Sequence, residues 1–125
     1  MLLYFIRHGQ TDWNKDMRMQ GQSDIPLNEN GRESAIEAGK TLANTHIDLA
    51  FSSPLKRAKE TAEILLERRN IPLYEDQRIQ EISFGSYEGM SCVDKTKEEN
   101  LAFQKFFQDT GNYIPPEDAE SVEQL

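Results

Sequence analysis

The sequence holds few of the features that mark secreted or membrane-spanning proteins. Its 125 residues include one cysteine, Cys92, so an internal disulfide is excluded and a reducing compartment is expected. Cys92 has no other Cys and no His close to it in sequence, and we interpret it as an ordinary thiol. The apolar run behind Met1 meets a charge at Arg7 and is too short for a signal-peptide core or a membrane span. We therefore expect a cytoplasmic protein with no membrane partner.

The chain also lacks an excess of positive charge. It has 14 Lys and Arg against 22 Asp and Glu, a formal net charge of −8. A general nucleic-acid-binding protein usually needs a basic face, so no nucleic-acid partner is expected. A phosphorylated substrate is still compatible, because a pocket can be locally positive inside a negative surface. The length fits one small domain with one core, spanning residues 1–125.

Short apolar runs alternate along the chain with stretches of helical periodicity. Residues 2–6, 48–52 and 71–74 are expected to be strands, the first buried on both faces and the third at an edge. Strands separated by helices predict an α/β fold with a parallel sheet and right-handed crossovers.

Three helices are expected, over a stretch that ends near residue 44, over 55–69 and over roughly 95–109. Asn28 or Asn30 is the predicted cap of the first, whose stripe of small residues suits close packing on a sheet. Ser53 is the predicted cap of the second, with Pro54 at its first helical position. The last helix is expected to bury, in part, Leu101, Phe103, Phe106 and Phe107.

Arg7 and His8 follow the first apolar run directly. A histidine at the end of a buried strand would lie at the rim of the sheet, where open α/β folds bind ligands. A neutral imidazole attacks phosphorus well and leaves well, and Arg7 adds a fixed positive charge with forked donors. We interpret the pair as a reactive imidazole facing a phosphate, with a purely structural histidine as the alternative.

Arg57 is expected in the first turn of the second helix. Free N–H groups and the helix dipole already favour an anion there, and a guanidinium adds a bidentate grip. The alternative is a solvated surface arginine, since Lys56 and Lys59 flank it.

Glu81 lies in an irregular stretch beside Ile82 and Phe84. Burial of these two apolar side chains would hold Glu81 in a drier place and raise its pKa. A carboxyl that stays protonated near neutral pH can donate to a leaving oxygen. A solvated glutamate is the alternative.

A polar loop, residues 11–26, follows the Arg7-His8 pair. Loops of this length are more often functional than idle. Asn14, Gln20 and Gly21 are candidates to line a phosphate site, with ordinary turn chemistry as the alternative.

Taken together, these stretches resemble the histidine phosphatase superfamily, the phosphoglycerate-mutase-like fold. Four blocks carry the resemblance in the family's order and spacing, namely Arg7–Asn14, Gln20–Leu27, Ser52–Ala62 and Glu81–Gly89. The resemblance implies a three-layer α/β/α fold with a mostly parallel sheet, and a phosphohistidine on His8. Arg7 and Arg57 would clamp the phosphoryl oxygens, and Glu81 would protonate the leaving alcohol and then activate water. Asn14 and Gly21 would touch phosphate or substrate, and no metal or cofactor is implied.

The resemblance also implies a second catalytic histidine, which this sequence lacks. The other histidine, His46, lies in the connection before the second expected strand and matches no catalytic position. Residues 119–121, Ala-Glu-Ser, resemble the Gly-Glu-Ser that precedes the missing strand in the family. The fold is therefore expected to be incomplete at its C-terminus. The strand at 2–6 would lose a neighbour, which a homodimer or swapped dimer would cover.

The expected function is hydrolysis of a phosphomonoester of a small metabolite, with activity impaired in this chain. Candidate substrates are a sugar phosphate, phosphoglycerate or the phosphorylated base of cobalamin assembly. A phosphoglycerate-type mutase is one alternative. A catalytically dead phosphate-binding or interaction module is another.

Overall fold

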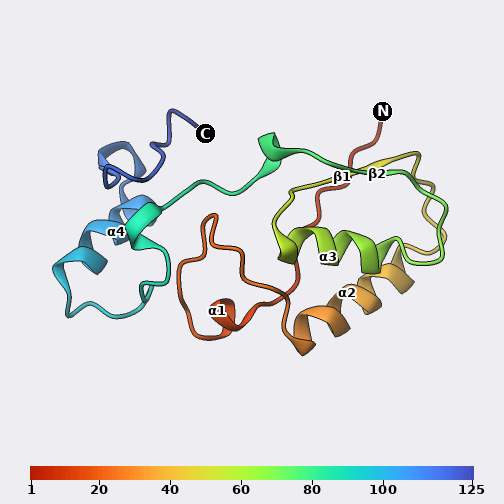
Figure 1. Ribbon diagram of the computed structural model, residues 1–125, viewed down its shortest axis with the longest axis horizontal. Coiled ribbons are helices and arrows are strands. Elements are labelled where there is room, and N and C mark those ends of the chain that lie inside the picture. Colours follow the sequence, from red (N-terminus) through yellow and green to blue (C-terminus); the bar gives the residue numbers. More distant parts are fainter. The chain divides into compact units, whose positions relative to one another are not determined.

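The computed structural model describes residues 1–125, apart from the side chain of Glu99. The chain divides into two compact units (Figure 1). Unit 1 contains residues 1–11 and 25–80, and unit 2 contains residues 12–24 and 81–125. No helix of the described residues is both long and apolar enough to cross a membrane.

Unit 1 is built around two short parallel strands joined by a helix. They are β1 (Ala50–Ser52) and β2 (Leu73–Glu75), with Ala50 opposite Leu73 and Ser52 opposite Glu75. Helix α3 (Lys56–Leu65) connects them. The second and third predicted strands and their parallel pairing are therefore confirmed, with shorter strands than expected.

The strand expected at residues 2–6 is wrong. This segment lies outside the sheet, which has two strands within the described residues, and its side chains are exposed, Phe5 to 91%. An apolar run forms a buried strand only when neighbouring strands accept its backbone hydrogen bonds and cover both its faces. The sequence pattern shows that the side chains are apolar, but it does not show whether neighbouring strands are present to pair with them.

Helix α2 (Glu29–Thr41) packs on α3 rather than on the sheet. Its predicted cap is confirmed, because the Asn28 side chain accepts a hydrogen bond from the Gly31 N–H at 2.9 Å. Gly39 lies at this contact, where a Cβ would meet the Leu65 carbonyl oxygen at 3.4 Å, an ordinary van der Waals distance. The predicted stripe of small residues thus serves a helix–helix contact.

Helix α3 begins later than predicted. Leu55 holds the cap position with an extended backbone, and no side chain caps the helix. The Ser53 hydroxyl instead accepts from the Leu55 N–H at 3.3 Å, and the Ser52 hydroxyl donates to the Ser53 carbonyl at 2.9 Å. Such local serine bonds compete with helix formation, and here they turn the chain ahead of the helix.

Unit 2 contains α1 (Asp12–Lys15), α4 (Glu98–Gln108) and two 3-10 turns, η2 (Gly85–Tyr87) and η3 (Thr110–Asn112). A third such turn, η1 (Gln77–Ile79), belongs to unit 1. The core of unit 2 consists of Ile82, Phe84 and Phe103.

Aromatic rings give this core much of its contact. Phe84 meets Phe103 and Phe106 edge to face, with ring centroids 5.4 Å and 4.9 Å apart. Phe103 is fully buried and Phe106 half-buried, as predicted. Leu101 and Phe107 are exposed, contrary to the prediction, because a helix of period 3.6 turns only part of its circumference toward one core.

Candidate active site

The two nitrogens of the His8 ring contact groups that define one tautomer. Nδ1 lies 2.7 Å from the carbonyl oxygen of Gly9, which can only accept, so Nδ1 carries the proton. Nε2 lies 3.2 Å from Nε of Arg57, which can only donate, so Nε2 presents a lone pair. Both contacts agree on an imidazole whose unprotonated nitrogen is Nε2. The structure therefore brings two of the predicted site residues, His8 and Arg57, into direct contact.

Arg57 lies in the first turn of α3, as predicted, and it is 2% exposed. The alternative of a solvated surface arginine is therefore wrong. A guanidinium this deeply buried costs free energy unless hydrogen bonds or an anion compensate it. The bond to His8 is one compensation, and a phosphoryl group bound beside His8 would add another.

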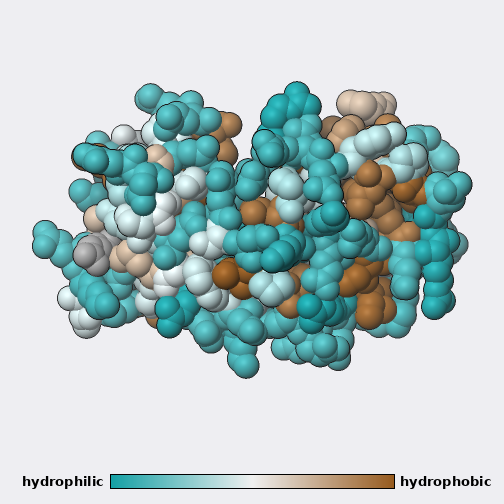
Figure 2. All heavy atoms as spheres, viewed as in Figure 1, coloured by the Kyte–Doolittle hydropathy of each residue, from teal (hydrophilic) through white to brown (hydrophobic). Residues whose placement is uncertain are grey.

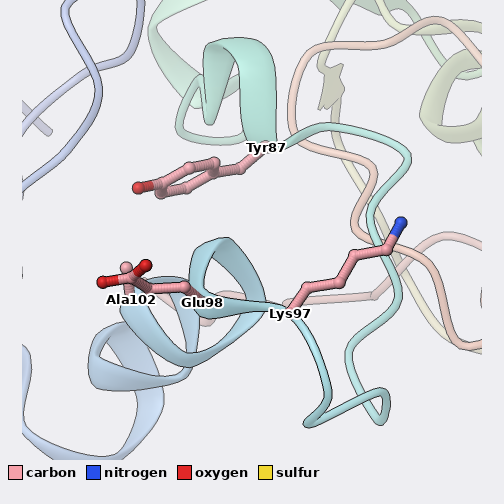
Figure 3. A pocket seen from close by; sticks show the side chains of 4 residues that line it. All are labelled: Tyr87, Lys97, Glu98 and Ala102. Atoms are coloured by element: carbon pink, nitrogen blue, oxygen red, sulfur yellow. The ribbon is translucent and has the colours of Figure 1, made fainter.

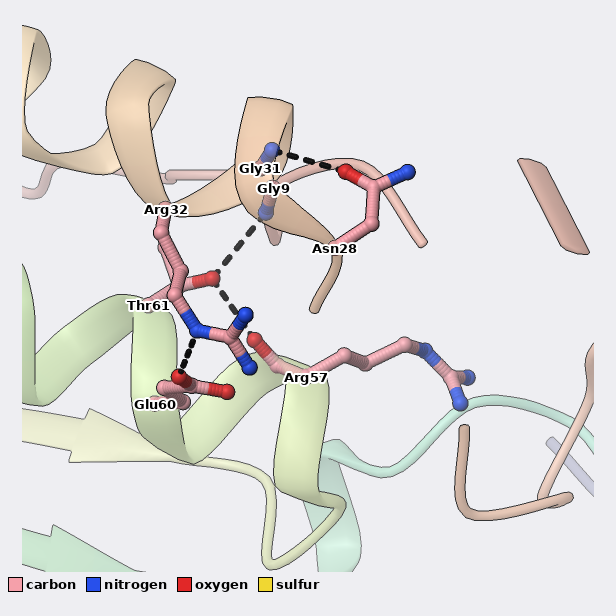
Figure 4. A network of polar contacts seen from close by, with 7 residues as sticks. All are labelled: Gly9, Asn28, Gly31, Arg32, Arg57, Glu60 and Thr61. Atoms are coloured by element: carbon pink, nitrogen blue, oxygen red, sulfur yellow. Dashed lines mark hydrogen bonds and ion pairs between the residues drawn. The ribbon is translucent and has the colours of Figure 1, made fainter. Parts of the chain in front are cut away.

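The backbone that carries His8 is tied to both helices of unit 1 (Figure 4). On the α3 side, the Gly9 N–H donates to the Thr61 hydroxyl at 3.0 Å. On the α2 side, a Cβ at Gly9 would lie 2.5 Å from the Gly31 carbonyl oxygen, so only glycine fits. A Cβ at Gly31 would lie 2.2 Å from the carbonyl oxygen of Gln10.

Gln10 completes the attachment to the start of α2. Its carbonyl oxygen accepts from the Asn28 N–H at 2.9 Å, and its side-chain oxygen accepts from the Asn28 amide at 3.0 Å. The segment 8–10 is thus fixed on two sides, which limits the freedom of the backbone that carries the His8 imidazole.

Arg7 is exposed. The structure does not test its expected place in a phosphate clamp, which stays a prediction.

The remaining predicted site residues belong to unit 2. Glu81 is exposed, and its Oε1 accepts from the Ile82 N–H at 3.1 Å. Ile82 and Phe84 are buried as expected, at 1% and 3% exposure. The drier surroundings predicted for Glu81 are nevertheless absent in the described chain, because buried and more exposed side chains alternate along residues 81–84.

Gln20 and Gly21 are buried within the polar loop at residues 11–26. Gly21 has φ of 53°, and a Cβ there would lie 2.2 Å from Oε1 of Glu88. Asn14 is half-buried in α1. A direct role of these three residues at a phosphate stays a prediction.

Glu88 received no role from the sequence, and the structure gives it one. Its Oε1 accepts from the N–H groups of Gln22 at 2.9 Å and Phe84 at 3.1 Å. Its Oε2 accepts a short bond from the Ser23 hydroxyl. One carboxylate therefore joins the loop at 20–23 to the block that begins at Glu81. The sequence offered one signal for Glu88, its place directly before Gly89 in the fourth block. It did not show which N–H and O–H groups would donate to the carboxylate.

Two further features of unit 2 involve none of these residues. Burial raises the pKa of the Cys92 thiol, in keeping with an unreactive side chain. A shallow pocket is lined by Tyr87, Lys97, Glu98 and Ala102 (Figure 3), none of which is a predicted site residue. Among the residues that the structure describes, no group of three or more His, Cys, Asp and Glu side chains is placed to hold a metal ion.

Comparisons with known proteins agree on one family. A model of the histidine phosphatase superfamily, branch 1, matches residues 3–125. A Bacillus subtilis protein named as an uncharacterized phosphatase, PhoE, is 44% identical over 92 residues, which cover 74% of this chain and 48% of that protein. A Salmonella arizonae protein named as a probable phosphoglycerate mutase, GpmB, is 34% identical over 123 residues, covering 98% of this chain and 57% of that protein.

Solved structures show the same fold. The α-ribazole phosphatase from Shigella flexneri superposes with a TM-score of 0.81 at 30% identity, covering 94% of this chain and 58% of that one. The chain spans about half the length of the curated relatives it matches. On the family match and the shared α/β fold, the chain belongs to the histidine phosphatase superfamily, branch 1.

Proposed function

We propose that the protein is a phosphomonoester hydrolase that forms a phosphohistidine on His8. The observation that carries the proposal is the tautomer of His8, whose Nε2 lone pair faces the buried Arg57. A lone pair on Nε2 is what attack on phosphorus requires, and a guanidinium beside it stabilises the charge that develops on the phosphoryl oxygens.

The proposed reaction has two transfers. Nε2 of His8 attacks phosphorus, the bond to the leaving oxygen breaks, and Glu81 gives that oxygen a proton. Water then attacks the phosphohistidine while Glu81 takes a proton, and inorganic phosphate leaves. Arg7 and Arg57 bind the phosphoryl oxygens throughout, and Asn14, Gln20 and Gly21 contact phosphate or substrate.

We expect the 125-residue chain to turn over slowly. The resemblance implies a second histidine that this sequence lacks, and loss of one such donor typically costs about 2.7–4 kcal/mol of transition-state stabilisation. The proposed substrate is a small phosphorylated metabolite. Phosphoglycerate and the phosphorylated base of cobalamin assembly are candidates supported by the names of the relatives, and a sugar phosphate is the third.

Single-turnover labelling tests the proposal without requiring fast turnover. The chain is incubated with a 32P-labelled aryl phosphate, and acid-labile, base-stable phosphoramidate is measured. We expect label on wild type and none on His8→Asn. His46→Asn is the control, since it removes the other histidine of the sequence, which is exposed, and it should be labelled like wild type. Label that persists in His8→Asn would refute the phosphohistidine. Wild-type protein that is folded but unlabelled would favour a phosphate-binding or interaction module without catalysis.

A mutase is the second candidate, favoured by the GpmB relative, which matches almost the whole chain. Product analysis separates the two functions. With a phosphoglycerate as substrate, a hydrolase releases inorganic phosphate, and a mutase transfers the phosphoryl group to the second hydroxyl.

A further inference from the structure

Thr61 is a buried polar residue of unit 1, 5% exposed, one turn after Arg57 on α3. Its hydroxyl donates to the Arg57 carbonyl at 2.6 Å and accepts from the Gly9 N–H at 3.0 Å (Figure 4). The carbonyl can only accept, so the hydroxyl proton lies on the Arg57 side and a lone pair meets Gly9. The hydroxyl is thus satisfied in both directions by backbone groups of the two site segments.

These bonds close a ring of four hydrogen bonds. Thr61 holds the Gly9 N–H, the Gly9 carbonyl holds Nδ1 of His8, and Nε2 of His8 meets Nε of Arg57. The fourth bond, from the Thr61 hydroxyl to the Arg57 carbonyl, closes the ring. Arg57 is thereby linked to His8 twice, directly through its guanidinium and indirectly through its carbonyl, Thr61 and Gly9.

The Gly9 N–H belongs to the peptide that follows His8. Fixing this peptide fixes the direction in which the His8 side chain leaves the backbone. Glycine resists rotation about its backbone bonds less than any other residue, so an external bond is needed to hold this peptide. Van der Waals contact with Gly31 blocks one side of the segment, and the Thr61 bond sets its orientation.

We propose that Thr61 is a positioning residue for His8. It holds the peptide that joins His8 to Gly9 and so fixes the backbone from which the imidazole extends, which keeps Nδ1 within reach of the Gly9 carbonyl and the Nε2 lone pair directed at Arg57. The catalytic part of this inference rests on the proposed function. The structural part concerns the tautomer of His8 and is measured without turnover.

The test is 15N NMR of the histidine rings in the 125-residue chain. Thr61→Val removes the hydroxyl with little change of shape, and Thr61→Ser restores it. Thr41→Val is a matched control, since the Thr41 hydroxyl makes the same kind of bond to the carbonyl four residues earlier, at 3.2 Å, but lies exposed on α2. We expect the Nδ1–H tautomer of His8 in wild type, Thr61→Ser and Thr41→Val, and a mixture of tautomers in Thr61→Val.

A second readout follows the chemistry. The rate of His8 labelling by an aryl phosphate is expected to fall roughly tenfold to hundredfold in Thr61→Val, as displacements of about 1 Å do, with the concentration for half-maximal rate little changed. Thr61→Ser is expected to recover most of the rate. A chain in which wild type shows the expected tautomer but accepts no label would contradict the proposed function and leave the positioning role standing.

Two results would overturn the inference. One is a folded Thr61→Val in which His8 keeps the Nδ1–H tautomer unchanged. The other is fast hydrogen exchange at the Gly9 amide in wild type or in Thr61→Ser, which can be measured even if Thr61→Val does not fold. The bond to residue 61 should make this exchange slow in both proteins. Exchange as fast as in an exposed loop would show that the bond is not formed.

Discussion

Single atoms determine the state of the His8 ring. A carbonyl oxygen cannot donate and a guanidinium N–H cannot accept, so the two contacts of the ring agree on one tautomer. The position of Arg57 at a helix start predicted a phosphate grip, and the resemblance implied that it shares one phosphoryl site with His8. The sequence did not predict Thr61, because threonine in a helix is ordinary and its partner, Gly9, is 52 residues away.

The close packing of Gly31 against the segment at residues 8–10 leads to a prediction about stability. Gly31→Ala would place a Cβ 2.2 Å from the Gln10 carbonyl oxygen, so backbone must move, at a cost of about 1–3 kcal/mol. Gly39→Ala on the same helix meets nothing nearer than 3.4 Å and is expected to be neutral or to stabilise by up to about 1 kcal/mol. Urea unfolding measures both, and equal effects would contradict the close approach at Gly31.

Glu88 gives a second prediction at this scale. Glu88→Gln removes the charge from an acceptor of three hydrogen bonds, each worth about 1.5–3 kcal/mol when charge-assisted. We expect faster hydrogen exchange at the amides of Gln22 and Phe84. Glu81→Gln is the control, since the side chain of Glu81 accepts from its neighbour Ile82 and leaves those two amides untouched. Unchanged exchange in Glu88→Gln would mean that the carboxylate does not hold the loop.

The proposed acid role of Glu81 is tested separately by leaving-group dependence. Alkyl phosphates need a proton on the leaving oxygen and aryl phosphates need little, so Glu81→Gln should slow transfer from the former far more. Labelling rates with a matched pair of substrates give the comparison. Equal slowing would argue against Glu81 as the proton donor.

At the scale of elements, local chemistry predicted helices better than strands. Asn28 caps α2 as expected, because a cap needs only a side-chain oxygen near free N–H groups of the same turn. Ser53 was predicted to do the same for α3 and instead bonds to Leu55 ahead of the helix. Residues 2–6 failed as a strand because a strand's stability comes from neighbours that local sequence does not contain.

The cap of α2 can be measured against a neighbouring asparagine. Asn28→Ala removes the bond to the Gly31 N–H and is expected to destabilise the chain by about 0.5–2 kcal/mol. Asn30→Ala loses only an exposed 3.4 Å contact with Gln10 and is expected to change stability by a few tenths of a kcal/mol at most. Denaturant unfolding that ranks Asn30 above Asn28 would contradict the assignment of the cap.

The turn η1 adds a pH-dependent contribution to the free energy of unfolding. Hydrogen bonds from Arg78 lower the pKa of Asp76 from 3.8 to about 2. A folded-state pKa below the ordinary value means that the stabilisation is complete above pH 3.8 and is lost as the pH falls toward 2. Asp76→Asn keeps a capping side chain without the charge. We expect the difference in unfolding free energy between wild type and this variant to shrink over that range, and a difference independent of pH would refute it.

At the scale of the whole molecule, apolar surface of unit 1 reaches solvent. Leu2, Leu3 and Phe5 are 60–91% exposed. On the two-stranded sheet, Phe51 and Tyr74 are more than half exposed and pair with ring centroids 5.7 Å apart. Brown, apolar atoms are visible in Figure 2 over the part of the view that holds β1 and β2. Exposed apolar segments favour association with another chain.

We therefore predict that the 125-residue chain self-associates through residues 2–6. Sedimentation velocity over a wide concentration range should show dimers or larger species whose fraction rises with concentration. Leu3→Lys combined with Phe5→Lys places two charges on this segment and should shift the chain toward monomer, without loss of folding because both side chains are exposed. Ile36→Lys changes an exposed apolar residue on α2 and should leave association as it is, because single apolar side chains on a helix surface do not drive pairing. A chain that stays monomeric at all concentrations, or an Ile36 variant that dissociates as fully as the double variant, would place the contact elsewhere than residues 2–6.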